Sequence, residues 1–132
     1  ESYYVSRLSP CRHVLKEVIK DVNFSNRDQI FAAFGRFTAR LHEQGMLHAD
    51  YSMGNILFEP TKQGAEFQLV DLNRMRFGQR INCRRGCRNF ERIDTDSHAL
   101  SVIARAYAQA RGYNEEECVR LVLKMRWRKH KK

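Results

Sequence analysis

Three polar residues at a fixed spacing, followed by a fourth farther along the chain, suggest one particular chemistry. His48, Asp50 and Asn55 stand in the run L-H-A-D-Y-S-M-G-N at H-x-D-x-x-x-x-N spacing, and Asp71 follows an apolar run in L-V-D-L-N-R. Phosphoryl transfer uses such a set, because an Asp orients the attacking hydroxyl while an Asn and a second Asp hold magnesium. Polar loop residues after a helix would give the same letters by chance, so the flanking elements have to decide.

A long amphipathic helix is expected directly before this run. An apolar stripe at helical spacing extends from Ile30 to Leu41, after Asn26, a favourable N-cap residue. Gly45 is suited to end this helix in a left-handed conformation. Such a helix would deliver the backbone into the polar loop from a rigid scaffold.

A β-hairpin is expected directly after the run. Residues 56–59 and 66–72 have the composition of strands, and residues 60–64 contain the Pro and Gly of a longer turn. Antiparallel pairing places the start of the first strand beside the end of the second. Asn55 and Asp71 are therefore expected at the same edge of the hairpin.

The remaining segments indicate a mainly α (α+β) domain of ordinary size. In chain order they are a strand over 2–8, a helix from Pro10 to about Lys20, an irregular arginine-rich stretch over 74–92, a helix that Asp94 or Thr95 caps and Gly112 ends, and a last helix that begins at Asn114 and buries Cys118. A chain of 132 residues suits a single domain with one core.

The net charge of the chain limits the classes of binding partner that are expected. The 24 Lys+Arg residues against 15 Asp+Glu give a net charge of +9, which favours nucleic acid, phosphates or an anionic membrane surface. No signature of a nucleic-acid-binding fold accompanies the charge, so nucleic acid is the least favoured of these. No apolar run reaches the ~20 residues that span a bilayer.

The four cysteines do not form a recognisable framework. Cys83 and Cys87 are four residues apart and lack the second pair that a zinc site would want, and Cys11 and Cys118 are distant in sequence. Reduced thiols in a cytosolic protein are expected, with metal binding or a disulfide as the alternatives. Cys118 falls among apolar helical positions and is expected to be a small core residue.

The order of long helix, H-x-D-x-x-x-x-N, hairpin and acidic residue resembles the C-terminal lobe of the protein-kinase-like fold. H-A-D-Y-S-M-G-N-I-L-F and L-V-D-L-N-R-M-R-F look like the bacterial lipopolysaccharide kinase (Kdo/WaaP) family, which phosphorylates inner-core sugars from ATP. The resemblance implies that Asp50 is the catalytic base, that His48 supports the loop, and that Asn55 and Asp71 bind ATP through Mg²⁺. Ser52 replaces the usual kinase Lys and D-L-N replaces D-F-G, and both departures point away from a Ser/Thr protein kinase.

Mapped onto that fold, residues 1–132 form a single kinase-like C-lobe. Its parts are a hinge-side strand (1–9), the catalytic loop and metal-binding hairpin (48–73), an arginine-rich segment in the position of an activation loop (74–93), and C-terminal helices with a basic tail (94–132). No glycine-rich phosphate loop and no strand Lys paired with a helix Glu are present, and position 1 is not Met. We therefore expect a fragment that begins mid-protein and that, by itself, binds ATP poorly and has little activity.

The arginine-rich segment and the tail suggest an anionic acceptor at a membrane. Arg74, Arg76, Arg84 and Arg85 are candidates to contact a lipopolysaccharide core sugar or another anionic glycan, since Arg binds carboxylate and phosphate in a bidentate manner. The tail 124–132 combines Lys and Arg with a Trp, which favours an anionic membrane surface at the inner face of the cytoplasmic membrane. Solvated, flexible segments are the alternative for both.

Two other functions remain open. A small-molecule kinase of the same fold, such as an aminoglycoside phosphotransferase, would share the same catalytic groups. A pseudokinase or basic binding module would keep the fold without the reaction. The presence of Asp50, Asn55 and Asp71 together argues against such degeneration.

Overall fold

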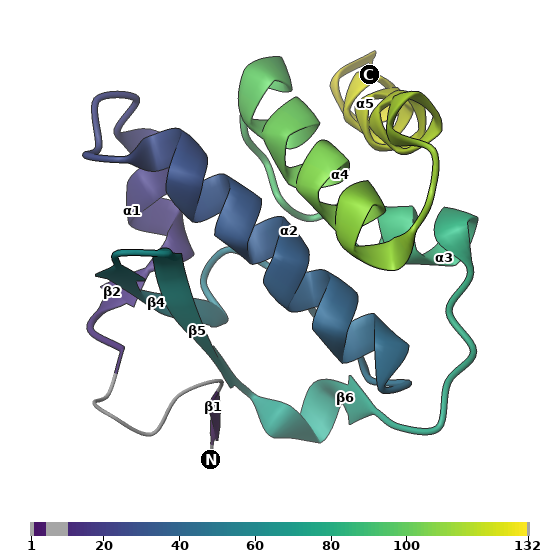
Figure 1. Ribbon diagram of the computed structural model, residues 1–132, viewed down its shortest axis with the longest axis horizontal. Coiled ribbons are helices and arrows are strands. Elements are labelled where there is room, and N and C mark those ends of the chain that lie inside the picture. Colours follow the sequence, from purple (N-terminus) through teal and green to yellow (C-terminus); the bar gives the residue numbers. More distant parts are fainter. Residues whose placement is uncertain (1, 5–10, 132) are drawn as a thin grey trace.

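The computed structural model describes residues 2–4 and 11–131, with α2 lying between a β-hairpin and two further helices (Figure 1). In chain order the elements are β1 (Ser2–Tyr4), β2 (His13–Val14), α1 (Leu15–Lys20), α2 (Arg27–Glu43), β3 (Leu47–His48), β4 (Ile56–Thr61), β5 (Gly64–Val70), the 3-10 helix η1 (Leu72–Arg74), β6 (Met75–Arg76), α3 (Cys83–Arg88), α4 (Ser97–Arg111) and α5 (Glu115–Lys131). The described chain is mainly helical with small antiparallel sheets, as the sequence indicates.

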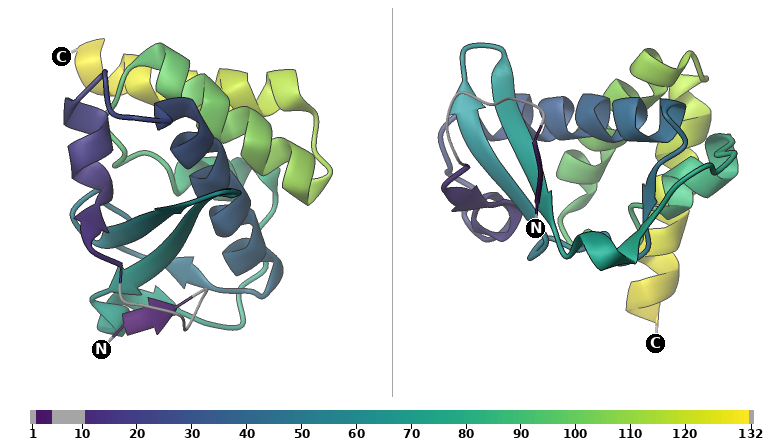
Figure 2. Two further views of the ribbon diagram at one scale, coloured as in Figure 1. Left: turned by 60° about the vertical axis from the view of Figure 1, so that its left-hand side comes forward. Right: turned by 90° about the horizontal axis from the view of Figure 1, so that it is seen from below.

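The helix α2 is the centre of the core. Its side chains Phe31, Phe34 and Phe37 are buried, and the hairpin β4–β5 lies on one side of it with α4 and α5 on the other (Figure 2). Gly35 lets α4 approach, since a Cβ at this position would overlap the carbonyl oxygen of Ile103. The buried apolar side chains of both layers form one continuous cluster.

The helix α2 begins and ends at the residues expected from the sequence. Asn26 is the N-cap, although it adopts a left-handed conformation with φ 59° and makes no side-chain capping hydrogen bond. Gly45 has φ +76° and turns the chain out of the helix. The backbone N–H of Gln79 donates to the Gly45 carbonyl at 2.9 Å, which ties this exit to the arginine-rich segment.

The main sheet has the strand order β1-β5-β4-β2, and all its pairs are antiparallel. The expected long turn over 60–64 is wrong, because Pro60 pairs with Ala65 and Thr61 pairs with Gly64. Gly64 has φ +126°, and a Cβ there would lie 3.0 Å from both the Ala33 Cβ and the Gln29 carbonyl of α2. A glycine at this point allows a tight hairpin end to pack directly on the helix.

The predicted start of the first helix is also wrong. Pro10 and residues 5–8 of the expected first strand lie outside the described residues, and α1 begins only at Leu15. His13 pairs with Phe58 of β4 and stacks on its ring with centroids 5.2 Å apart. This pairing with a distant strand extends the backbone where local sequence favours a helix.

The arginine-rich segment (residues 74–93) is more regular than the sequence indicates. It contains β6 and the helix α3, which the Asn82 side chain caps by accepting from the Arg85 N–H at 2.9 Å. Gly86 and Cys87 are buried on the inner face of α3. Because the buried face of α3 consists of small residues between arginines, the hydrophobic pattern of the sequence does not indicate it.

The last two helices begin and end close to the expected places. Asp96, rather than Asp94 or Thr95, caps α4 by accepting from the Ala99 N–H at 2.8 Å. Gly112 ends α4 with φ 75°, and Asn114 accepts from the Glu117 N–H at 2.9 Å at the start of α5. Among the described residues, no helix has the length and apolar content needed to cross a bilayer.

Candidate active site

The catalytic loop, residues 47–55, is held at both ends by short strands. It starts in β3, where Leu47 pairs with Arg76 and His48 pairs with Met75 of β6. The Ala49 N–H donates to the carbonyl of Arg74 at 2.8 Å. The loop is therefore fixed to the segment that follows Asp71, although the two are distant in sequence.

His48 braces the loop with both ring nitrogens. Nε2 lies 3.0 Å from the Val70 carbonyl, which can only accept, so Nε2 carries the hydrogen. Nδ1 then accepts from the backbone N–H of Asp50 at 3.1 Å. The buried ring is neutral and fully engaged, which suits the supporting role expected for it and leaves no nitrogen for proton transfer.

Asp50 and Asn55 contact each other across the loop. The Asn55 Nδ2 donates to the backbone carbonyl of Asp50 at 3.0 Å and to its carboxylate Oδ2 at 3.2 Å. The amide oxygen of Asn55 accepts no hydrogen bond from the described residues. This geometry orients the Asp50 carboxylate while keeping one hard oxygen of Asn55 available to a cation.

Asp71 comes to the same end of the hairpin as Asn55. The Val70 N–H donates to the Asn55 carbonyl at 3.1 Å, so the antiparallel pairing of the hairpin continues as far as Asn55. Asp71 directly follows Val70 in the chain and therefore lies at this end of the hairpin. Asp71 itself has φ 61° and ψ 53°, a left-handed conformation that few non-glycine residues adopt and that clusters at functional sites. Its carboxylate is exposed and accepts no hydrogen bond from the described residues. Carboxylate and amide oxygens are the ligand types that Mg²⁺ prefers.

Arg92 is a site residue that sequence reasoning did not select. Its NH1 lies 3.5 Å from the Asp50 Oδ1, and both side chains are partly open to solvent. The Arg92 guanidinium therefore contacts the Asp50 carboxylate from the side of the arginine-rich segment. In the sequence, only its position in the arginine-rich segment indicated that Arg92 could lie near the catalytic loop.

Tyr51 anchors the loop in the core. Its hydroxyl lies 2.6 Å from the Thr38 Oγ1, which in turn donates to the Phe34 carbonyl at 3.0 Å. Its ring stacks on the Phe34 ring with centroids 5.5 Å apart, and burial raises the pKa of the hydroxyl. An aromatic residue directly after Asp50, with a Thr on the apolar face of α2, is the signal that could have identified this anchor.

A chain of hydrogen bonds connects the loop to the helical layer. The Asn89 Nδ2 donates to the His48 carbonyl at 3.1 Å, and its Oδ1 accepts from the His42 Nε2 at 2.9 Å. The His42 Nδ1 accepts from the Tyr107 hydroxyl at 2.7 Å, and this hydroxyl accepts from Arg111 at 3.0 Å. Burial lowers the pKa of His42 from its ordinary 6.5 to about 4, so the ring is neutral at physiological pH.

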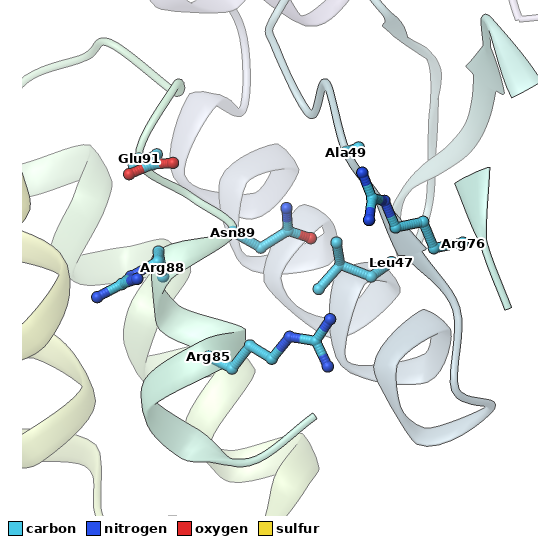
Figure 3. A pocket seen from close by; sticks show the side chains of 7 residues that line it. All are labelled: Leu47, Ala49, Arg76, Arg85, Arg88, Asn89 and Glu91. Atoms are coloured by element: carbon cyan, nitrogen blue, oxygen red, sulfur yellow. The ribbon is translucent and has the colours of Figure 1, made fainter. Parts of the chain in front are cut away.

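A pocket of about 230 Å³ opens beside the catalytic loop (Figure 3). Leu47 and Ala49 form its loop side, with Asn89 next to them, and Arg76 and Arg85 approach it from β6 and α3. Because Ala49 directly precedes Asp50, a molecule bound there would lie next to the catalytic loop.

The charge of this arginine pocket is mainly positive. Arg88 also lines it, although its guanidinium points away from the other two in Figure 3, and Glu91 is the only acidic lining residue. Arg85 is oriented by two neutral acceptors, the Arg80 carbonyl at 2.9 Å and the Gln79 Oε1 at 2.6 Å. Arg76 makes no side-chain hydrogen bond or ion pair with the described residues. The pocket thus offers cationic donors whose charge the protein does not neutralise.

The expected substrate arginines divide into two pairs. All four side chains are exposed, but only Arg76 and Arg85 line the pocket. The spacing of arginines in sequence could not separate these pairs, because the separation depends on the turn at η1 and the orientation of α3.

Comparison with known families identifies one family whose model covers most of the chain. The model of the lipopolysaccharide kinase (Kdo/WaaP) family matches residues 12–113. The match includes the catalytic loop, the hairpin, the arginine-rich segment and α4. No curated protein matches the chain.

Proposed function

The chain belongs to the lipopolysaccharide kinase (Kdo/WaaP) family, and we propose that it carries the catalytic groups of an ATP-dependent kinase for an inner-core sugar, Kdo or heptose. Members of this family are kinases, so phosphoryl transfer is the general activity. One observation carries the finer proposal. Asn55 holds the Asp50 carboxylate with its amide nitrogen, which leaves its amide oxygen without a donor among the described residues, and the backbone pairing brings Asp71 to the same end of the hairpin.

The proposed reaction places Asp50 next to the acceptor. Its carboxylate accepts a hydrogen bond from a sugar hydroxyl and orients the oxygen for in-line attack on the γ-phosphorus of ATP. It takes the proton as the new oxygen–phosphorus bond forms, while the bond from phosphorus to the bridging oxygen breaks and ADP leaves. Asn55 and Asp71 would hold Mg²⁺, which offsets charge on the nucleotide phosphates when it is bound. His48 and Tyr51 keep the loop backbone in place and do not enter the reaction.

The proposal includes a kinase-like C-lobe. The 132 residues contain no G-x-G-x-x-G run, so we propose that the groups covering the nucleotide phosphates are not among them. For the same reason we propose that this chain by itself transfers phosphate slowly.

The arginine pocket supports an acidic acceptor. Kdo carries a carboxylate and lipid A carries phosphates, and a guanidinium pairs with either group in a bidentate manner. Arg76 and Arg85 converge on the pocket from two elements, which suits an anionic group held from both sides. We further propose peripheral association with the cytoplasmic face of the membrane, where an anionic surface would attract the basic end of α5.

The decisive experiment offers two acceptors to the protein in its natural form. With ATP and Mg²⁺, we expect phosphorylation of Kdo-lipid A and none of an aminoglycoside. Asp50→Ala should lower the rate at least ~10³-fold with an unchanged unfolding temperature, whereas Asp28→Ala, at an exposed aspartate, should keep full activity. Transfer to the aminoglycoside would favour the other small-molecule kinases, and absence of any transfer would favour a pseudokinase. Turnover that survives in Asp50→Ala would refute the assignment of the base.

A second experiment tests the acceptor site. Arg76→Gln and Arg85→Gln should each raise the KM for Kdo-lipid A about tenfold and leave the KM for ATP unchanged, because a charge-assisted contact contributes roughly 1.5–3 kcal/mol. Arg40→Gln, at an exposed arginine of α2 outside the pocket, is the matched control. Equal effects of all three substitutions would show that only net charge matters.

A further inference from the structure

Three of the four cysteines meet where α3 packs against α5. Cys83 and Cys87 occupy positions i and i+4 of α3 and so project from the same face of the helix, and Cys118 lies in the first turns of α5. The three Sγ atoms lie within 4.8 Å of one another, and those of Cys83 and Cys118 are 3.5 Å apart. All three thiols are free.

These separations match those of a metal site. At a Zn–S bond length of ~2.3 Å, tetrahedral geometry places neighbouring sulfurs about 3.8 Å apart. The observed sulfurs are already close to that distance, and they come from two helices that face one point. We propose that Cys83, Cys87 and Cys118 bind a thiophilic metal ion, with Zn²⁺ as its most suitable occupant.

The surroundings suit the charge and coordination of such a site. Cys87 and Cys118 are fully buried, whereas Cys83 is half-buried, so a water can complete the coordination from the Cys83 side. Three thiolates and a divalent cation carry one net negative charge. Arg111 donates from NH2 to the carbonyl of Ile81 at 2.7 Å and to the Tyr113 hydroxyl at 2.7 Å, residues that precede Cys83 and Cys118 in the chain.

Binding requires no oxidant or reductant. Each thiol releases its proton to solvent as its sulfur binds the ion, and the metal keeps its oxidation state. The site is independent of phosphoryl transfer, because it uses neither Asp50 nor Asp71. Its consequence for the molecule is mechanical, since a metal would fasten α3, and with it Arg85, to the helix α5.

Cobalt is the probe that reads out sulfur ligation directly. The full-length protein is reduced, freed of metal by a chelator, and titrated with Co²⁺ in excess Mg²⁺, which occupies oxygen-ligand sites. We expect one equivalent of Co²⁺ to give thiolate-to-cobalt charge-transfer absorption and the intense visible bands of tetrahedral cobalt. One equivalent of Zn²⁺ should abolish both.

Cysteine variants assign the signal. Cys83→Ser and Cys118→Ser should each reduce the charge-transfer absorption at one equivalent at least tenfold, whereas Cys11→Ser, at the cysteine beside Glu66, should leave it unchanged. Cys83 is the informative position if the buried variant fails to fold, because its side chain is half-buried. The proposal is overturned if the unmodified protein shows no such absorption, or if Cys83→Ser retains it.

Discussion

The catalytic loop and the arginine-rich segment lie side by side but differ in how their polar side chains are paired within the protein. In the loop, the side chains of His48 and Tyr51 bond to other parts of the protein. The Asp50 carboxylate is contacted by Asn55 within the loop and by Arg92 from outside it. In the arginine-rich segment, guanidinium groups such as that of Arg76 extend into a pocket without an acidic partner among the described residues.

Under the proposed function, the difference follows from what each region would have to do. A group that takes a proton must stay within hydrogen-bond distance of one oxygen atom, so its orientation is prepared by the fold. A group that receives an acidic ligand must keep its charge available until the ligand arrives. The unpaired cations of the pocket and the engaged polar groups of the loop are therefore complementary features of one site.

The two regions are coupled through α3. Asn89 directly follows this helix and donates to the His48 carbonyl of the loop, while Arg85 of the same helix faces the pocket. Gly86 and Cys87 hold the helix against Tyr107 and α5. A change that displaces α3 should consequently affect both regions together.

Gly86→Ala should produce the largest effect on stability. A Cβ at position 86 would overlap the Tyr107 hydroxyl and lie 3.2 Å from the His42 Nδ1, so α3 would be pushed off the hydrogen-bonded chain behind the loop. We expect a loss of about 3 kcal/mol in the free energy of unfolding, measured by urea denaturation. Gly54→Ala is the matched control, because no atom lies within 4 Å of a Cβ at that position. Similar costs for both variants would contradict a rigidly seated α3.

The pH dependence of stability should reveal the buried histidine behind the loop. The pKa of His42 is lowered to about 4 by burial, so the unfolded chain binds a proton that the folded chain does not. Stability is therefore complete above pH ~6.5 and falls as the pH decreases toward 4, by about 2 kcal/mol between pH 7 and pH 5. His42→Gln, which keeps a donor and an acceptor but does not titrate, should lack this component. Parallel curves for both proteins would show that His42 is not neutral in the fold.

Arg84→Gln should have the smallest effect. Arg84 is exposed and does not line the arginine pocket, although it is adjacent in sequence to Arg85. We expect the KM of this variant for the acceptor to remain within about twofold of the original value, because surface charges away from a binding site contribute little to the free energy of binding. A large increase would mean that the acceptor's acidic group binds over the outer face of α3 and not in the pocket.

Local patterns in the sequence were sufficient for much of the scaffold. The stripe of α2, the left-handed glycines at 45 and 112 and the cap at Asn114 depend on neighbouring residues, and the structure contains all of them. The juxtaposition of Asn55 and Asp71 was also accessible, because antiparallel pairing alone brings the two ends of a hairpin together.

Pattern reading failed where a distant partner decided the local conformation. Residues 13 and 14 are a strand because β4 offers them a free edge, and Asp96 caps α4 while its carboxylate also pairs with Arg27 at 3.1 Å. The helix α3 was invisible in an arginine-rich run, since its buried face consists of small residues that gain their apolar role only against α4 and α5.

The sequence by itself determined which chemical groups are present and, through the spacing of 48, 50 and 55, that they share one loop. Only the tertiary structure decided which arginines face that loop, that His42 and Asn89 support it from behind, and that three cysteines meet between α3 and α5. Spacing along a chain specifies neighbours within a turn or a hairpin, where geometry is fixed by backbone hydrogen bonds. Contacts between elements depend instead on how buried surfaces fit together, which no single segment encodes.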